Sequence, residues 1–178
     1  MSRSGAPALS LAEWVVLCLV GEGPTYGFAV ASLVAPDGEL GHVWRVQRPV
    51  VYRALQRLGE LGLMSAAGVE STSHGPARTV LQVTTVGDTA RLRWLDEPVA
   101  HVRDVRSELM VKLALLDRAG IDPAALLTAQ HRTLEPIAEA LRRRRDEKSG
   151  FERTLADWRY EMALATLKFL DGAMSSRL

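Results

Sequence analysis

The chain has 178 residues, a length typical of one or two domains. Hydrophobic residues make up 47% and charged residues 24%, which excludes a wholly disordered chain, a collagen-like fibre and a polytopic membrane protein. The 22 Lys and Arg residues against 21 Asp and Glu residues give a net charge of +1. This balance excludes a strongly basic protein that coats nucleic acid, but it is compatible with a local basic surface.

Nothing in the sequence indicates catalysis, a metal site or a cofactor. The single cysteine, Cys18, cannot form an intrachain disulfide, and the four histidines share no metal-ligand spacing. The apolar run Trp14–Val20 is too short to cross a membrane and lacks the features of a signal peptide. We therefore expect a cytoplasmic protein that is not an enzyme, with no cofactor, no metal and no membrane partner.

Residues 9–21 are predicted to form the first helix. Ser10 and Glu13 have the spacing of a capping box, in which each residue's side chain binds the other's backbone N–H. The apolar stripe of this helix comprises Trp14, Leu17 and Cys18. Thr25 is expected to cap a second helix that runs to about Ala35.

The third predicted helix is the most informative element. Pro49 suits the first helical position, and Gly62 suits the position after the last turn. Between Arg45 and Gly59 there are four arginines and no acidic residue, on a chain that is almost neutral overall. The predicted inward face consists of Val51, Leu55 and Leu58, and the outward face of Arg48, Tyr52, Arg53 and Arg57.

Two short strands are predicted after this helix, over residues 63–69 and 79–84, with a polar loop between them. Thr84 or Thr85 then caps a fourth helix that runs to Asp96. Three helices with such a hairpin indicate a winged helix-turn-helix. The predicted fold is mainly α-helical with a small β-hairpin wing.

A basic outward face on such a helix favours DNA binding, because an α-helix fits the major groove and arginines contact phosphates. The alternative is a solvated face, with Arg53 and Arg57 beside Glu60 and with Tyr52 packed on the first helix. The predicted DNA-binding residues are Thr25, Tyr26, Arg45, Gln47, Arg48, Tyr52, Arg53, Arg57, His74 and Arg78.

Before Pro98 the predicted segments are short and interrupted by Gly and Pro, and after it the helical patterns are longer with fewer such breaks. This change predicts a DNA-binding domain over residues 1–97 and a helical dimerisation domain over residues 98–178. Three helices are expected in the second domain, and Pro136 should kink or break the middle one. The last helix carries a coiled-coil-like seam, which packs equally well inside one bundle or across a dimer. The predicted dimerisation residues are Leu109, Leu113, Leu155, Trp158, Met162 and Phe169.

The run Arg142–Arg145 is a second basic cluster. It lies at the C-terminal end of a predicted helix, where cations interact favourably with the helix dipole. Asp146 and Glu147 follow immediately and partly cancel its charge. We therefore predict a solvated helix end and not a second DNA-binding site.

Four motifs in order resemble the PadR-like family of transcriptional regulators, over residues 9–96. They are Gly23–Phe28, Val51–Leu55, Leu58–Leu63 and Val83–Gly87. The resemblance implies a dimer formed by the C-terminal helices and a repressor that is often released from DNA by a small aromatic or hydrophobic ligand. Trp158 is the candidate ligand contact, although a large apolar side chain at such a position more often fills the dimer core. The chain departs from many relatives at Gln47, Arg48, Pro49 and Leu81, which puts the operator sequence in doubt but not the fold.

The predicted function is a homodimeric, sequence-specific DNA-binding regulator, acting as a repressor on an inverted repeat of double-stranded DNA. Its two recognition helices would lie about 34 Å apart, one turn of DNA. The small-molecule effector is implied by the resemblance only. One alternative is a winged helix whose basic face docks a partner protein, and another is a ligand carrier with a vestigial DNA-binding face.

Overall fold

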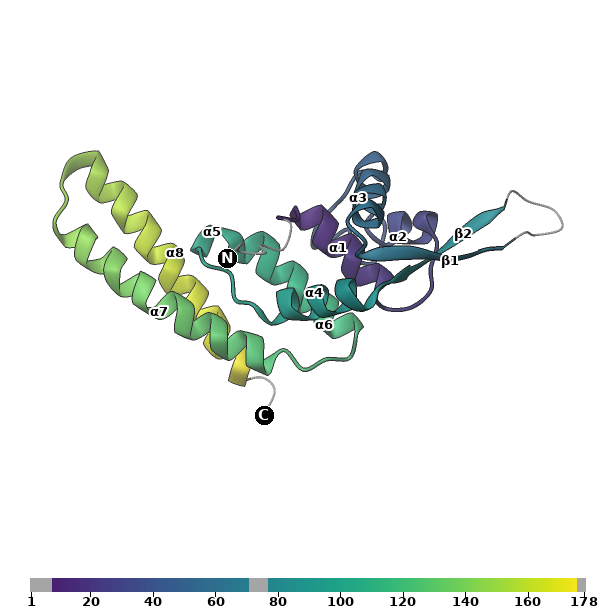
Figure 1. The fold of residues 1–178 in the computed structure, drawn as a ribbon. Helices are drawn as coiled ribbons and strands as arrows, with labels where there is room; N and C mark the ends of the chain where they lie inside the picture. The colour runs from purple at the N-terminus through teal and green to yellow at the C-terminus, as the bar shows by residue number, and fades with distance from the viewer. Residues whose placement is uncertain (1–7, 71–76, 176–178) are drawn as a thin grey trace, which may run out of the picture. The chain divides into compact units, whose positions relative to one another are not determined.

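The computed structural model describes residues 8–70 and 77–175 of the chain. The chain separates into two compact units, Met1–Leu95 and Asp96–Leu178 (Figure 1). Within the described residues the fold is mainly helical with one two-stranded antiparallel hairpin, so the predicted fold class is confirmed. The assignment of DNA binding to residues 1–97 and of dimerisation to residues 98–178 stays a prediction.

Helix α1 (Leu11–Val20) is the central element of the first unit. The predicted capping box is confirmed: the backbone N–H of Ser10 donates to Glu13 Oε2 at 2.6 Å, and the backbone N–H of Glu13 donates to Ser10 Oγ at 3.4 Å. The predicted single apolar stripe is too narrow, because all residues from Val15 to Val20 are buried. Such a helix lies inside the core, and α1 contacts helices α2 and α3 and strand β2.

Helix α2 (Gly27–Leu33) begins later than predicted, and Thr25 is not its cap. The backbone of Thr25 pairs instead with Leu81: the N–H of Thr25 donates to the Leu81 carbonyl at 3.0 Å, and the N–H of Leu81 donates back at 2.7 Å. Because Thr25 is extended to make this pair, Tyr26 occupies the N-cap position, without a side-chain capping bond.

Helix α3 (Arg48–Glu60) buries Val51, Leu55 and Leu58, as predicted. Pro49 is its second residue and not its first, which is equally tolerated because the first-turn N–H groups have no partner within the helix. The helix ends in a Schellman motif around Gly62, whose φ of 69° favours glycine. The N–H of Leu63 donates to the Leu58 carbonyl at 3.0 Å, and that of Gly62 to the Gly59 carbonyl at 3.0 Å.

Strands β1 (Met64–Glu70) and β2 (Arg78–Val83) form the predicted wing. They are antiparallel, with Met64 opposite Val83 and Glu70 opposite Arg78, and the register shifts between Ala66 and Gly68. The loop between the strands includes His74, and this predicted DNA-binding residue lies outside the described residues.

Helix α4 (Thr85–Asp96) starts at a junction that we call the wing junction, formed by Gly62, Leu63, Thr84 and Gly87. Of the two predicted caps, Thr84 is the one used: its Oγ1 accepts from the N–H of Gly87 at 3.1 Å and donates to the Gly62 carbonyl at 2.8 Å. The N–H of Thr84 donates to the Leu63 carbonyl at 3.0 Å. A Cβ atom on Gly87 would collide with that same carbonyl oxygen.

The second unit begins with a helical segment made of α5 (Val102–Asp104), the π-helical turn η1 (Val105–Leu109) and α6 (Met110–Arg118). Helices α7 (Ala124–Asp146) and α8 (Gly150–Ser175) follow and pack along each other (Figure 1). The predicted break at Pro136 is wrong, because α7 continues through it. Packing along α8 offsets the loss of one backbone hydrogen bond.

Buried polar side chains hold the start of the second unit in place. The amide of Gln130 is fully buried and pairs with the backbone of Val99, donating to its carbonyl at 2.9 Å and accepting from its N–H at 2.8 Å. Lys112 Nζ donates to the Glu97 carbonyl at 2.6 Å and lies 2.9 Å from Glu108 Oε1.

Of the helices in the described part of the chain, none has both the length and the apolar content to cross a membrane.

Replacing Gly87 by alanine should destabilise the fold, because the new methyl group meets the Leu63 carbonyl at the wing junction. We expect the free energy of unfolding to fall by about 1–3 kcal/mol, the usual cost of overpacking. The matched control is Gly59→Ala in α3, where an added Cβ has no neighbour within 4 Å. Alanine has the higher helix propensity, so this control should stabilise by up to about 1 kcal/mol. Urea unfolding checks both, and equal effects of the two variants would contradict the junction geometry.

Candidate nucleic-acid interface

The outward side of α3 and the residues just before it carry exposed side chains with few partners. Gln47, Arg48 and Arg53 are exposed, Arg45 is exposed on the preceding segment, and Tyr52 is 44% exposed. Among the described residues, none of the three arginines forms an ion pair with a carboxylate. The structure therefore places five of the predicted DNA-binding residues together on one surface.

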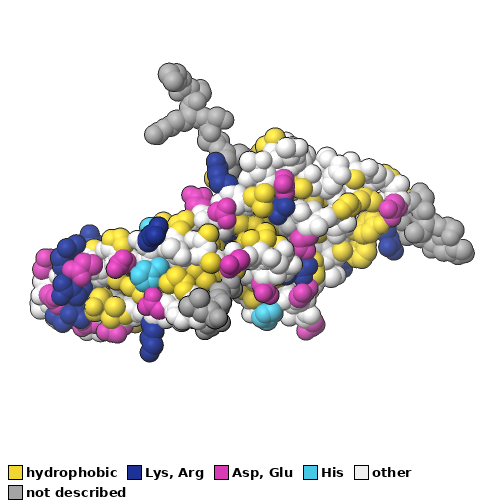
Figure 2. Space-filling model, turned by 90° about the horizontal axis from the view of Figure 1, so that it is seen from below, with side chains coloured by type: hydrophobic (Ala, Val, Ile, Leu, Met, Phe, Trp, Pro, Cys, Tyr) yellow, Lys and Arg dark blue, Asp and Glu magenta, His cyan; other side chains and the backbone are white. Residues whose placement is uncertain are grey.

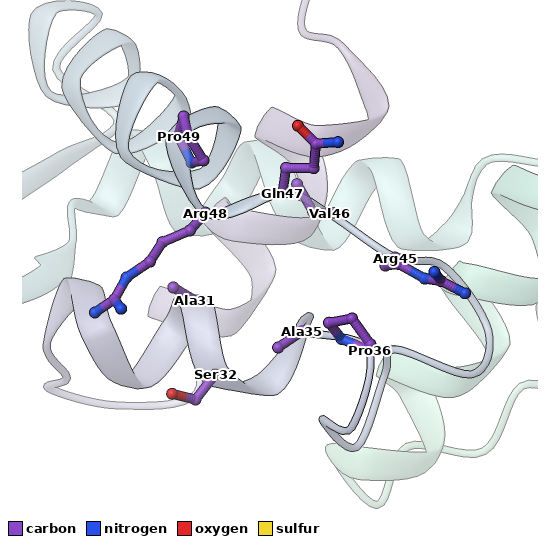
Figure 3. Close-up of a pocket in the computed structure, with 9 residues that line it drawn as sticks. All are labelled: Ala31, Ser32, Ala35, Pro36, Arg45, Val46, Gln47, Arg48 and Pro49. Carbon is purple, nitrogen blue, oxygen red and sulfur yellow. The ribbon is translucent and has the colours of Figure 1, made fainter.

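A pocket of 430 Å³ lies between α2 and the start of α3 (Figure 3). The side chains of Arg45 and Arg48 extend from different parts of its rim and point away from each other. Gln47 makes no capping hydrogen bond, so its amide is available to a ligand. Because the two guanidinium groups diverge, they suit two separate anionic groups and not one small anion.

Arg57 differs from the other arginines of α3. Its Nε lies 3.0 Å from Glu13 Oε1, while Glu13 Oε2 accepts from the backbone and hydroxyl of Ser10. Its partner is therefore Glu13 on α1 and not Glu60, which accepts from Gln56 Nε2 at 2.9 Å. Arg57 joins α3 to α1, and its place in a DNA interface stays a prediction.

The wing is attached to α2 by side-chain contacts. The hydroxyl of Tyr26 donates a short hydrogen bond to Glu70 Oε2 at the end of β1. The rings of Tyr26 and Phe28 stack with centroids 5.6 Å apart, and the guanidinium carbon of Arg78 lies 5.2 Å from the centroid of Phe28. Arg78 is thus held beside α2 by an aromatic ring, and no ion pair of its own is found among the described residues.

Tyr52 packs on α2, and its packing on the first helix stays a prediction. Gly27 approaches it so closely that an added Cβ would lie 3.2 Å from Tyr52 Cε1 and 3.1 Å from Leu55 Cδ1. The guanidinium of Arg48 lies 6.0 Å from the ring centroid of Tyr52. One part of the ring therefore packs on α2 and the other part faces solvent.

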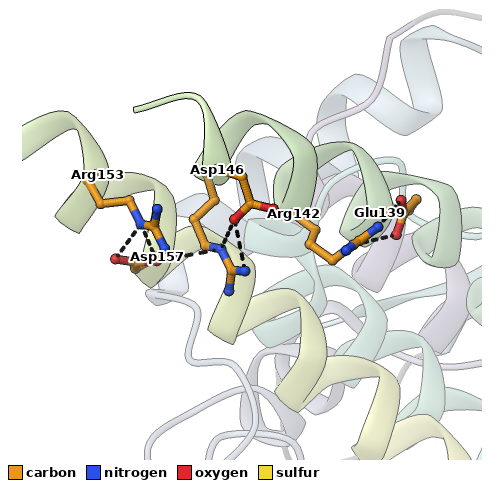
Figure 4. A network of polar contacts seen from close by, with 6 residues as sticks. Glu139, Arg142, Asp146, Arg153 and Asp157 are labelled. Carbon is orange, nitrogen blue, oxygen red and sulfur yellow. Dashed lines mark hydrogen bonds and ion pairs between the residues drawn. The ribbon is translucent and has the colours of Figure 1, made fainter. Parts of the chain in front are cut away.

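The Arg142–Arg145 run is extensively paired (Figure 4). Arg142 forms two hydrogen bonds of 3.0 Å to Glu139, which lower the pKa of that carboxyl group. Arg145 lies 3.0 Å from an Asp146 oxygen and 3.8 Å from Asp157. Around the connection between α7 and α8, at the left of Figure 2, basic and acidic side chains are intermingled. This pairing agrees with the prediction of a solvated helix end.

The predicted seam of α8 lies on its exposed side. Trp158 is 62% exposed, and Met162 and Phe169 are also exposed, whereas Ala163 and Leu170 are buried. The remaining predicted dimerisation residues are less accessible: Leu155 and Leu113 are half-buried and Leu109 is fully buried within the chain. The seam is therefore apolar, exposed and separate from the buried positions of α8.

Sequence reasoning missed three residues of these surfaces. Phe28 and Glu70 act through contacts with Tyr26 and Arg78, and neither residue belongs to a periodic pattern that indicates this role. Phe151, which is 80% exposed, extends the α8 seam by one more step of four residues before Leu155. The four-residue spacing between Phe151 and Leu155 was enough to predict that Phe151 belongs to the seam.

Comparisons with known proteins come from families and solved structures. A family model described as the transcriptional regulator PadR-like family matches residues 16–93, and as predicted it is not a family of enzymes. No curated protein matches the chain.

Three solved structures are similar at low scores. They are Bacillus subtilis PadR with operator DNA (TM-score 0.49, 15% identity, 95% of this chain and 99% of that chain), the same protein with p-coumaric acid (0.44, 16%, 94% and 98%), and smu.1604c from Streptococcus mutans UA159 (0.43, 12%, 92% and 98%).

The Tyr26–Glu70 contact predicts an unusual phenol titration. The hydrogen bond to Glu70 raises the pKa of Tyr26 above its ordinary value, so the contact is present below that value and is lost as the pH rises through the raised pKa. Absorbance titration should show one tyrosine ionising at higher pH in the wild type than in Glu70→Ala. Tyr26→Phe should remove this same late phase. A late phase that survives in both variants would contradict the contact.

Proposed function

We propose that this chain represses transcription by binding duplex DNA as a homodimer, because residues 16–93 match the model of the PadR-like family of transcriptional regulators. The observation that supports DNA binding best is the contrast between its arginine clusters. In the Arg142–Arg145 run, Arg142 pairs with Glu139, and Arg145 pairs with Asp146 and Asp157. The arginines around the start of α3 have no such partners among the described residues, so their charge remains available to phosphates.

We define the recognition face as Arg45, Gln47, Arg48, Tyr52 and Arg53, with Arg78 on the wing. In the proposed mode α3 enters the major groove with its N-terminal turn leading. The amide of Gln47 and the hydroxyl of Tyr52 reach base edges, and the arginines contact phosphates and fix the register. Arg78 contacts the neighbouring backbone or the minor groove. Thr25, Tyr26 and Arg57 help to fix this surface through their contacts with Leu81, Glu70 and Glu13.

The homodimer is proposed from the α8 seam. Trp158, Met162 and Phe169 recur at spacings of four and seven residues and remain exposed in the single chain. A second copy that covers this seam would remove a continuous apolar strip from water. Two-fold symmetry would then present two copies of α3 to an inverted repeat, with half-sites about one helical turn apart.

The effector part of the proposal depends on family membership. A small aromatic or apolar ligand bound beside Trp158 would change the relation between the two recognition helices and release the operator. The ring of Trp158 is accessible in the single chain, so it can contact such a ligand or the second subunit. The proposed site of action is the cytoplasm.

DNA binding should depend steeply on salt. Against DNA from its own upstream region, with about 6–10 phosphate contacts, affinity should fall by orders of magnitude between 50 and 200 mM salt. Arg53→Ala should weaken binding, because its exposed guanidinium has no ion-pair partner among the described residues and is available to a phosphate. It should also reduce the slope of log K against log [salt] by about one, the value expected for one phosphate contact. Fluorescence anisotropy at several salt concentrations measures both quantities.

The matched control is Arg93→Ala, an exposed arginine on α4 outside the recognition face. It should leave affinity and slope close to those of the wild type. Binding that ignores salt, or equal losses in Arg53→Ala and Arg93→Ala, would contradict the proposed face. A salt-insensitive complex with a protein would support the alternative of a protein-docking winged helix.

Disrupting the α8 seam should separate the dimer. Trp158→Asp places a charge in the apolar strip, so we expect a monomer at micromolar concentration by light scattering, with an unchanged helical circular dichroism spectrum. Lys168→Asp, at an exposed position of the same helix about 100° around the axis from the centre of the seam, should remain a dimer. A dimeric Trp158→Asp, or a monomeric wild type, would overturn the proposed interface.

A further inference from the structure

We infer that the start of α3 reads two neighbouring base pairs in each half-site, an adenine through Gln47 and the methyl group of a thymine through Pro49. The inference rests on the proposed DNA binding and names the bases that this binding selects. Gln47 belongs to the recognition face, and Pro49 adds an apolar group beside it.

The backbone of Gln47 is fixed, while its side chain is exposed. Its carbonyl accepts from the N–H of Val50 at 2.9 Å and from the N–H of Val51 at 3.3 Å, so the residue is anchored at the N-cap position of α3. Its amide makes no capping hydrogen bond. A donor and an acceptor that extend together from a fixed backbone lose little conformational entropy when they bind a base.

Two arginines flank Gln47 and diverge from it. Figure 3 shows the side chains of Arg45 and Arg48 extending away from each other, and the amide of Gln47 pointing away from both. The major groove is about 12 Å wide and has a phosphate backbone on each side. The diverging guanidinium groups suit phosphates on opposite sides of the groove, which leaves the amide between them facing the base edges.

The chemistry of the Gln47 amide favours adenine over the other bases. In the major groove adenine presents the N7 acceptor beside the N6 donor, so the amide can donate through Nε2 and accept through Oε1 at one base. Guanine presents two acceptors, and cytosine and thymine each present a single polar group. With any of these three bases one atom of the amide would give up water without gaining a partner, which weakens binding.

Pro49 supplies an apolar contact to the next base pair. It is exposed and lies four residues before the exposed Arg53, so both residues face outward on the same side of α3. The proline ring has no N–H and presents only carbon to a base edge, and the apolar group of the major groove is the thymine methyl. Base pairs stack about 3.4 Å apart and a helical turn rises about 5.4 Å, so Gln47 and Pro49 meet neighbouring base pairs.

The test selects binding sites from duplexes that contain a randomised stretch, using the full chain. The wild type should select an adenine in each half-site by about tenfold or more over the other bases, next to a second A·T base pair. Gln47→Ala should lose the preference for this adenine. Gln47→Glu should replace it by a preference for cytosine, whose N4 amino group donates to a carboxylate. Circular dichroism checks that both variants fold, and a purely structural role of Gln47 would not change the selected base.

The matched control is Gln56→Ala. Gln56 is an exposed glutamine of the same helix, but its Nε2 already donates to Glu60 at 2.9 Å. This variant should select the same sequence as the wild type. If Gln47→Ala also selects the wild-type sequence, or if the wild type selects no adenine, the reading of adenine by Gln47 is wrong.

Base analogues test the contact of Pro49. Replacing the thymine of the second A·T base pair by uracil removes only the methyl group, and should weaken binding by the wild type about fourfold, the effect of one buried carbon. In Pro49→Ser the same replacement should have no effect. Uracil placed between the half-sites should leave the affinity of both proteins unchanged. Equal losses in the wild type and Pro49→Ser at the predicted thymine, or no loss in either, would overturn this contact.

These readouts separate the inference from the proposed function. Salt-dependent binding to duplex DNA with the same base preferences in the wild type, Gln47→Ala and Pro49→Ser would overturn the inference and leave the proposed function standing. Absence of binding to any duplex at low salt would overturn both.

Discussion

The hydrogen bonds of Thr84 hold together the end of α3, both strands of the wing and the start of α4. Its hydroxyl donates to the Gly62 carbonyl and accepts from Gly87, and its backbone N–H donates to the Leu63 carbonyl. Gly87 has no side chain because that carbonyl occupies the space. The wing consists of only two strands, which are marginal on their own. This junction, with the Thr25–Leu81 backbone pair, therefore fixes the wing relative to α3 and makes their outer sides one surface.

Arginines in the described residues have different surroundings. Arg57 serves the fold, since it binds the same glutamate that caps α1. Arg142 and Arg145 pair with nearby carboxylates, and Arg145 also lies over the ring of Tyr160. Arg45, Arg48 and Arg53 have no carboxylate partner, and exposed guanidinium groups of this kind gain most from a polyanion because little has to be broken first. Three arginines without an ion pair among the described residues thus lie in or just before the first half of α3, although the chain as a whole carries a net charge of only +1.

Local signals in the sequence were sufficient for most of the fold. The capping box of α1, the Schellman end of α3 and the cap of α4 depend on residues within six positions of each other, and all three follow from residue type and spacing. The errors involve distant partners. Thr25 pairs with Leu81 instead of capping α2, and Pro136 stays helical because α7 packs along α8. The candidate site was only half predictable for the same reason: the bond between Tyr26 and Glu70 spans 44 positions, and no periodicity encodes it.

The central claim is that the start of α3 and the wing form one DNA-binding surface. Hydrogen–deuterium exchange of the full chain, with and without duplex DNA from its own upstream region, tests this most directly. The account predicts slower exchange at residues 45–53 and 78–83, where uncapped first-turn N–H groups and the wing backbone would be covered. Residues 139–157, where Arg142, Arg145 and Arg153 are already paired with carboxylates, should exchange at the same rate in both samples. Protection of residues 139–157 without protection of residues 45–53 would contradict the account.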